Sequence, residues 1–255
     1  MQDPYAIDAE FYDRLHPPGG EDIGLWLSFA GRTALPVLEI GTGTGRIALE
    51  LAGAGHAVTA VDPSAAMLAI ARARNEDRGL DASFVEGSLS DVPIRVGDEY
   101  GFVLVPADVF LHCAAGEAQL ASLRQLRAAL AADGRLAIDL PGPASFIDGL
   151  HNGEPVLVYS APGDDGVHLD VWQVHEDDLA EQTRMLSMRY ERTLPDGTVR
   201  RSISEHRLRY VYRFEMEYLA HIAGLRLLTI AGDYELGELT HDSARMIFVF
   251  GRDDA

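Results

Sequence analysis

One glycine-rich segment indicates how the chain folds: Val37-Leu38-Glu39-Ile40-Gly41-Thr42-Gly43-Thr44-Gly45-Arg46. Its first residues have the apolar and β-branched character of a buried strand, and Ala/Leu-rich sequence over 47–54 predicts a helix after it. Alternate glycines between the two let the backbone take positive φ angles and leave it bare for a ligand at the helix start. The segment therefore predicts the first strand–turn–helix unit of a ligand-binding α/β sheet.

Strand-like and helix-like runs alternate through the residues that follow this unit. Strands are expected at 57–61, 82–85, 100–105 and 135–140, and helices at 65–74 and 117–131. Short connections between such runs predict right-handed crossovers and a parallel sheet buried on both faces. The fold class is therefore α/β, a doubly wound sheet.

The pattern changes after residue 143. Strand-like runs follow at 156–160, 168–175, 184–193 and 199–213. The last two flank a strong hairpin turn at Pro195-Asp196-Gly197. We expect an antiparallel β lid over 144–213, inserted in a single domain that spans 1–255. A helix at 215–223 and strands at 225–230 and 244–250 complete the core, and residues 1–30 form an N-terminal helical cover.

Composition excludes several classes of protein. The 255 residues carry 21 Lys+Arg against 40 Asp+Glu, a formal net charge of -19 that repels phosphate backbones and anionic lipid. No apolar run is long enough to span a bilayer, and the N-terminus does not resemble a signal peptide. A single cysteine, Cys113, excludes internal disulfides and multi-thiolate metal sites. We expect a cytoplasmic protein without a nucleic-acid partner, a membrane partner or a bound metal.

The end of the second strand carries an acidic residue, Asp62. A carboxylate at that position can accept hydrogen bonds from both hydroxyls of an adenosine ribose. It can also simply cap a helix that has Pro63 at its first position. Two other functions stay open: an NAD(P)-dependent oxidoreductase, because residues 43–48 fit a dinucleotide motif ending in Ala48, and a non-catalytic cofactor-binding or scaffold protein. The oxidoreductase is disfavoured because the chain contains no lysine, and so no Tyr-x-x-x-Lys pair.

Residues 39–45 followed by Asp62 resemble the first motifs of class I S-adenosylmethionine-dependent methyltransferases. Val85-Glu86-Gly87-Ser88-Leu89 resembles the third-strand motif, whose loop lies along the adenine, with Ser88 where the family often has an acid. Residues 103–112 resemble the fourth-strand motif near the transferred methyl, and residues 130–136 resemble the start of the fifth strand.

The resemblance implies a seven-stranded, mostly parallel sheet whose last strand is antiparallel, with S-adenosylmethionine as cofactor. An inserted lid is similar to that of glycine N-methyltransferase and of amino-sugar N,N-dimethyltransferases. The implied reaction is methyl transfer to a small-molecule acceptor, with N-methylation favoured over O- or C-methylation, and a homodimer stays open. The implied cofactor-binding residues are Glu39, Gly41, Thr42, Gly43, Gly45, Asp62, Pro63, Met67, Gly87, Ser88, Leu89, Val105 and Pro106.

In-line attack on a sulfonium methyl requires positioning above all. His112, just beyond the fourth strand, is either a general base or a packed histidine, and a base would make kcat/KM rise with pH near 6.5. Tyr12 belongs to a segment that resembles the cofactor cover of these enzymes and is the second catalytic candidate. Asp108 is either an amine ligand or a turn cap, and the aromatic candidates are either pocket or packing residues. The candidate substrate-binding residues are Asp108, Phe110, Trp172, Tyr190, Tyr210 and Tyr212.

Overall fold

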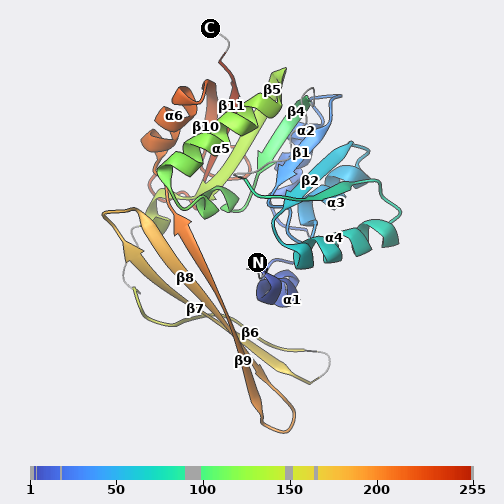
Figure 1. The fold of residues 1–255 in the computed structure, drawn as a ribbon, viewed down its shortest axis with the longest axis vertical. Helices are drawn as coiled ribbons and strands as arrows, with labels where there is room; N and C mark the ends of the chain where they lie inside the picture. Colours follow the sequence, from blue (N-terminus) through green and yellow to red (C-terminus); the bar gives the residue numbers. More distant parts are fainter. Residues whose placement is uncertain are drawn as a thin grey trace.

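A seven-stranded sheet forms the centre of the computed structural model (Figure 1), which describes residues 3, 5–17, 19–89, 99–146, 152–163 and 166–253. Its strands are β1 (Val37–Ile40), β2 (Val58–Asp62), β3 (Ser83–Glu86), β4 (Tyr100–Val105), β5 (Leu130–Pro141), β10 (Leu225–Ala231) and β11 (Arg245–Arg252). They lie in the order β10-β11-β5-β4-β1-β2-β3. Strands β1 to β5 pair in parallel, whereas β11 is antiparallel to both of its neighbours. The expected α/β sheet is confirmed.

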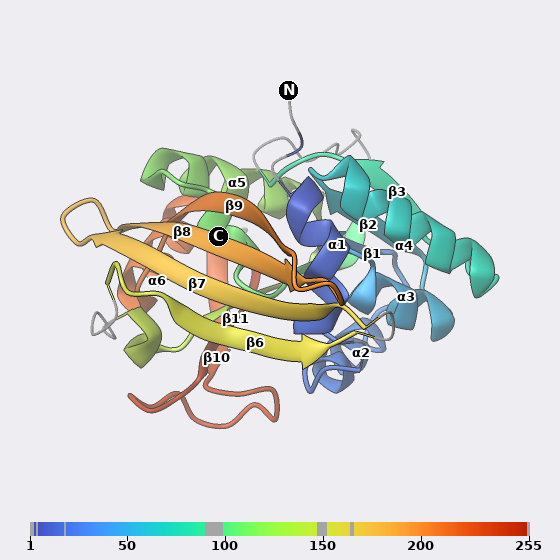
Figure 2. The ribbon, with the colours of Figure 1, turned by 90° about the horizontal axis from the view of Figure 1, so that it is seen from below.

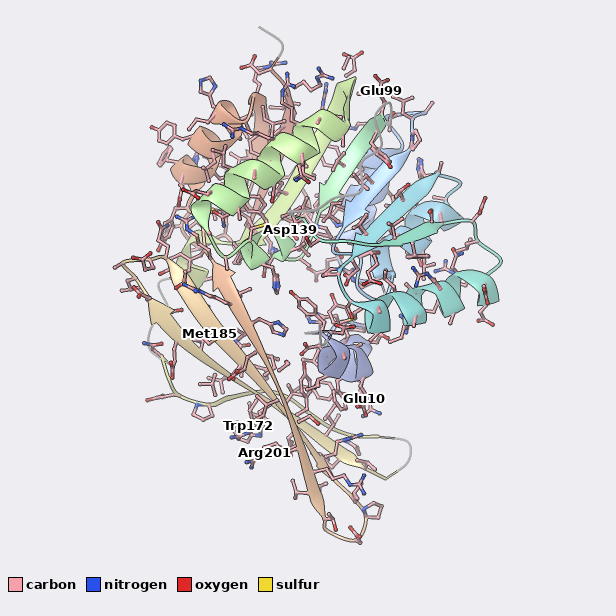
Figure 3. All side chains as sticks on the ribbon, viewed as in Figure 1. Glu10, Glu99, Asp139, Trp172, Met185 and Arg201 are labelled. Atoms are coloured by element: carbon pink, nitrogen blue, oxygen red, sulfur yellow. The ribbon has the colours of Figure 1, made fainter. Side chains whose placement is uncertain are left out.

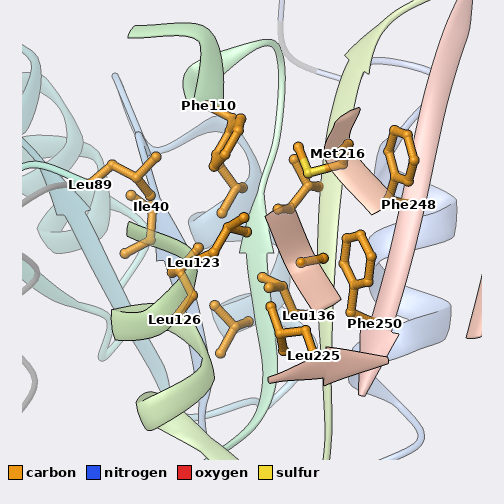
Figure 4. Close-up of a cluster of buried hydrophobic side chains, with 14 of the residues drawn as sticks. Ile40, Leu89, Phe110, Leu123, Leu126, Leu136, Met216, Leu225, Phe248 and Phe250 are labelled. Carbon is orange, nitrogen blue, oxygen red and sulfur yellow. The ribbon is translucent and has the colours of Figure 1, made fainter. Parts of the chain in front are cut away.

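Helices cover both faces of this sheet. On one face α2 (Ile23–Ala30) and α3 (Arg46–Gly53) bury Trp26 and Phe29 against β1 and β4. On the other face α5 (Gly116–Ala129) and α6 (Arg213–Ile222) bury leucines and Met216 against β5 and β11, as Figure 4 shows. Each fully buried side chain of this size contributes about 1.5–3 kcal/mol. These two cores hold the strand ends in fixed positions.

A second sheet lies beyond the carboxyl ends of the central strands (Figure 1). It contains β6 (Val156–Pro162), β7 (His168–Asp178), β8 (Thr183–Thr193) and β9 (Val199–Arg209), all antiparallel and in that order. Helix α1 (Ala6–Leu15) lies between this sheet and α4 (Ala65–Asp77) and contacts both α4 and β9 (Figure 2). We call this four-stranded sheet the lid.

Several boundaries differ from the expected ones. Helix α6 begins at Arg213, inside the range expected for the last lid strand. Of the expected N-terminal cover at 1–30, α2 packs on the core, so that α1 alone lies over the strand ends. Strand β5 begins at Leu130, and its pairing with β4 skips from Leu130 to Arg135. The residues between the helix expected at 117–131 and the strand expected at 135–140 therefore form an irregularity within the strand. Residues 147–151 and 164–165 of the expected lid lie outside the described residues. No described helix is both long enough and apolar enough to cross a membrane.

Candidate active site

A cavity of about 930 Å³ separates the carboxyl ends of the central strands from the lid. Its walls come from the loops after β1, β2, β3 and β4, from α1, and from the inner face of the lid. Figure 3 shows Asp139 of β5 at the core edge that faces the lid, and Trp172 and Arg201 farther out along the lid. The cavity therefore lies where open α/β sheets bind their ligands.

Asp62 joins the glycine turn to the end of β2. Its Oδ2 accepts the Gly43 N–H at 2.8 Å and its Oδ1 accepts the Ser64 N–H at 2.9 Å. Burial raises the pKa of Asp62, and the two backbone hydrogen bonds oppose that effect. Each carboxylate oxygen still has a second lone pair for a hydroxyl. Because Asp62 also lines the cavity, it fits a vicinal diol such as an adenosine ribose.

Backbone conformation favours glycine at both Gly41 and Gly43, and at Gly41 the protein's own packing requires it as well. Gly41 has a φ of +75°, and a Cβ there would lie 2.3 Å from Cγ2 of Val109. Gly43 has a φ of +55°, and a Cβ there would lie 3.6 Å from the Tyr12 ring. Bare backbone at these positions lets the loop after β4 and helix α1 approach the turn closely.

Glu39 and Thr42 support the turn from inside the protein. The Thr42 hydroxyl donates to Oε2 of Glu39 at 2.9 Å, and Glu39 is 1% exposed. Burial raises the pKa of Glu39 to about 7. Neither residue lines the cavity, so in this structure Glu39 acts on the site through the turn.

Two carboxylates tie the N-terminal segment to the site, Asp3 at the start of α4 and Asp13 at the glycine turn. Asp3 accepts from the Ser64 hydroxyl at 2.8 Å and from the Ala66 N–H at 3.1 Å. Asp13 accepts from the Thr44 hydroxyl at 2.8 Å and also pairs with Arg74. Burial raises the pKa of Tyr12 to about 12, so its hydroxyl stays protonated. Helix α1 therefore covers the turn with Tyr12 facing the cavity.

His112 ends η1 (Val109–His112), a short 3₁₀ helix beyond β4, and its ring opens into the cavity. Its Nδ1 is 2.9 Å from the hydroxyl of Tyr5, whose ring stacks on His206 with centroids 4.8 Å apart. Burial, together with the nearby His206, lowers the pKa of His112 to about 4. This lowered pKa differs from the expected titration near 6.5 and leaves the ring, which is exposed to the cavity, neutral at pH 7. Burial also raises the pKa of Tyr5 to about 12.

A buried carboxylate, Asp8, connects α1 to the lid. Its Oδ1 accepts from the hydroxyls of Tyr190 and Ser204, each at 2.5 Å, and its Oδ2 lies 2.9 Å from Nε2 of His206. Burial opposes the charged form, but the hydrogen bonds from His206, Ser204 and Tyr190 outweigh it and lower the pKa of Asp8. Asp8 is therefore ionised at neutral pH and fixes the lid against α1.

Asp108 lies in an unusual turn after β4. Ala107 and Asp108 have φ values of +48° and +65°, a left-handed conformation that non-glycine residues rarely adopt. Arg245 donates from Nη2 to Oδ1 of Asp108 at 2.7 Å and from Nε to Oδ1 of Asp139 at 2.7 Å. The Asp108 side chain makes no capping hydrogen bond, so it forms an ion pair beside the cavity rather than a turn cap.

Comparisons with known proteins agree with this geometry. Residues 37–134 match a family model described as a methyltransferase domain. The cypemycin N-terminal methyltransferase of a Streptomyces species is 28% identical over 99% of this chain and 100% of its own length. The solved CcbJ methyltransferase from Streptomyces caelestis has a TM-score of 0.79 and 25% identity, covering 96% of this chain and 95% of its own. The chain is an S-adenosylmethionine-dependent methyltransferase.

The methyltransferase also shares its whole fold with the S-adenosylmethionine-bound structure of CalS10, an amino pentose methyltransferase from Micromonospora echinaspora. That likeness has a TM-score of 0.72 at 18% identity and covers 99% of this chain and 97% of the other. This likeness confirms the expected class I fold. The small-molecule methyl-transfer activity and the cofactor are confirmed by the comparisons taken together with the matched methyltransferase domain. The oxidoreductase and scaffold alternatives are set aside.

Many of the expected site residues line the cavity of the methyltransferase. They are Tyr12, Gly41, Gly43, Asp62, Pro63, Met67, Gly87, Ser88, Leu89, Asp108, His112, Tyr190 and Tyr210. Apolar side chains such as Met67 and Leu89 fit the faces of an adenine beside Asp62. The described residues thus fit the adenosine and sulfonium groups of the cofactor.

Other expected residues lie outside the cavity lining for identifiable reasons. Phe110 is fully buried in the core (Figure 4). The Trp172 ring lies 5.3 Å from the Arg189 guanidinium, and Tyr212 is 39% exposed. A Cβ on Gly45 would meet Ala71 and Leu49, so that glycine serves packing. The expected residues outside the lining are Glu39, Thr42, Gly45, Val105, Pro106, Phe110, Trp172 and Tyr212.

Sequence reasoning missed the residues that connect α1 and the lid to the site. Tyr5, Asp8 and His206 line the cavity, yet they come from opposite ends of the chain. One signal was available in β9: Ser204 and His206 are two residues apart, so they share a face of the strand.

Proposed function

We propose that this methyltransferase methylates the nitrogen of a small amine that has an apolar body. The observation that carries the proposal is the charge of the cavity. Asp8, Asp62 and Asp108 line it, and Arg184 is the single arginine among the described lining residues. A negative cavity attracts cations, which favours an amine acceptor over an anionic one. The names of the N-terminal and amino pentose methyltransferases compared above also support nitrogen as the acceptor atom.

The bound cofactor supplies a methyl group that is already activated by a positive sulfur. The protein must therefore bring a nitrogen lone pair into line with that methyl and exclude water around it. Leu111, Leu186, Met188 and Leu208 give the cavity an apolar wall suited to both tasks. Asp62 and the backbone of the glycine turn hold the adenosine part in this proposal.

His112 orients the acceptor rather than removing its proton. An imidazole with a pKa of about 4 cannot deprotonate an alkylammonium ion, whose pKa resembles that of lysine at about 10.4. It can accept a hydrogen bond from the N–H of the neutral amine. Nε2 is free to do so in the tautomer whose Nδ1–H donates to the Tyr5 oxygen 2.9 Å away. The proton of an ammonium acceptor is then lost to solvent before attack.

The test compares amines with alcohols of the same carbon skeleton. Purified protein is incubated with S-adenosylmethionine and each acceptor, and both S-adenosylhomocysteine and the methylated product are measured by mass spectrometry. We expect the amine to gain a methyl on nitrogen and the matched alcohol to stay unchanged. Methylation of the alcohols or of carbon, with no amine accepted, would overturn the proposal.

The lid over 144–213 selects the acceptor in this proposal, with residues 1–255 acting as one domain and α1 as cover. The inner face of the lid supplies Leu186, Met188 and Leu208 to the cavity, whereas the cofactor-facing residues come from the core. We also propose that the protein acts in the cytoplasm without nucleic acid. The net charge of -19 supports the absence of a nucleic-acid partner.

A further inference from the structure

Arg184, near the start of β8, is held rigidly in the cavity wall. Its Nε and Nη2 donate to the two carboxylate oxygens of Asp177 at 2.7 and 2.8 Å. The Arg184 side chain is 16% exposed and that of Asp177 is 5% exposed. A two-point ion pair of this kind fixes the plane of the guanidinium.

The pair leaves hydrogen-bond donors of Arg184 unused. A guanidinium has five N–H groups, and two of them go to Asp177. Within the part of the chain that the structure describes, Asp177 is the hydrogen-bond partner of Arg184, and both N–H groups of Nη1 remain. Since Arg184 lines the cavity, these donors are available to a bound molecule.

Arg184 lies at the end of the cavity opposite the cofactor residues. In the lid it pairs with Leu208, one residue from Arg209, and Arg209 donates to Gln119 of α5 at 2.6 Å. Gln119 lies near the start of α5, which follows β4 in the chain, whereas Asp62 ends β2, two strands from β4 across β1. The His112 ring lies 5.8 Å from the ring of His206, which comes two residues before Leu208 on β9. An acceptor that presents its nitrogen near His112 therefore extends its body toward Arg184.

Tyr210 lies near Arg184, and the cavity wall also contains apolar residues. Leu208 is opposite Arg184 in the lid, Leu186 is two residues away on β8, and both line the cavity together with Ala114 and Ala118. A hydrogen-bonding group of the acceptor would find few other charged partners there. Arg184 is thus placed to fix the orientation of the acceptor within an apolar wall.

We propose that Arg184 binds a neutral oxygen of the acceptor, a carbonyl or hydroxyl oxygen remote from the nitrogen that is methylated. This inference rests on the proposed N-methylation and adds the substrate's second recognition group. A neutral oxygen fits better than a carboxylate because Asp177 already balances the charge of Arg184. A carboxylate would also add to the negative charge of Asp8, Asp62 and Asp108.

The test uses three matched series of primary amines with increasing chain length: n-alkylamines, ω-amino amides and ω-amino carboxylates. Their binding to the complex with S-adenosylhomocysteine is measured by calorimetry, and their methylation is measured separately. The variant is Arg184→Gln combined with Asp177→Asn, which removes both charges and leaves no unpaired buried carboxylate. The control is Arg192→Gln on the same strand, because Arg192 also pairs with a carboxylate, that of Glu10, but lies outside the cavity lining.

At the best chain length, the wild-type protein should bind the amide about 10- to 150-fold tighter than the alkylamine, the range for a hydrogen bond to a charged group. The double variant should lose that preference while its affinities for the alkylamine and for S-adenosylhomocysteine stay within a few-fold, and Arg192→Gln should keep it. No amide preference in the wild type at any length, an unchanged preference in the double variant, or a preference for carboxylates would overturn the inference. If amides bind preferentially but no nitrogen is methylated, the proposed function fails and the role of Arg184 stands.

Discussion

The attachment of α1 to the lid should depend on the single carboxylate of Asp8. This carboxylate accepts three hydrogen bonds, from Tyr190, Ser204 and His206, each worth about 1.5–3 kcal/mol when the acceptor is charged. In Asp8→Asn, the amide keeps at most two neutral hydrogen bonds, worth about 0.5–1.5 kcal/mol each, and turns a donor toward the third group. The free energy of opening α1 should therefore fall by about 1.5 kcal/mol or more.

Hydrogen exchange of the α1 amides measures that opening, and the expected loss corresponds to exchange at least about tenfold faster. Glu10→Gln on the same helix is the control, because its pair with Arg192 is exposed and worth at most about 1 kcal/mol. Since the pKa of Asp8 is lowered, its contribution is fully present above pH 3.8 and is lost as the pH falls through the lower folded pKa. Equal exchange in the two variants at neutral pH would refute the reasoning.

Three further predictions follow from the site. Gly41→Ala should lower the free energy of unfolding by about 1–3 kcal/mol in urea denaturation, because the new Cβ meets Val109. Gly55→Ala is the control: Gly55 also has a positive φ but lies in open space, so its substitution should lower that free energy less. Equal losses in the two variants would contradict the packing argument. His112→Asn should lower kcat/KM about tenfold with unchanged affinity for S-adenosylhomocysteine, whereas a loss of about 10²–10⁴-fold would indicate a general base. In wild-type profiles of kcat/KM against pH, no inflection should occur near 6.5, because burial lowers the pKa of His112 to about 4. The rise in kcat/KM should instead follow the pKa of each acceptor amine. An inflection that stays near 6.5 for every acceptor would contradict this prediction.

Local patterns were sufficient to predict the core of the fold. Each of these features depends on a few neighbouring residues: the glycine turn, the acid at Asp62, and the alternating strands and helices. The structure forms them as expected. The hairpin at Pro195-Asp196-Gly197 likewise follows from its own turn residues. Such features depend on backbone conformation and burial pattern, which sequence expresses directly.

The acceptor side of the site could not be predicted in this way. Asp8 and His206 meet across 198 residues, and Tyr5 and His112 across 107, so neither pair has a local signature. Aromatic residues were poor guides, because Phe110 and Trp172 have rings as suitable for packing as for a substrate. The lowered pKa of His112 could not be predicted, because it depends on neighbours such as His206 that only the packed lid brings near.

The most direct test of the central claim is calorimetric titration of S-adenosylhomocysteine and of NADH into the wild-type protein, Asp62→Asn and the exposed control Asp133→Asn. We predict that S-adenosylhomocysteine binds the wild type and the control equally. Asp62→Asn should bind it about 10- to 150-fold more weakly, a loss of about 1.5–3 kcal/mol, and NADH should not bind. Tight binding of NADH with no response to S-adenosylhomocysteine would contradict the account.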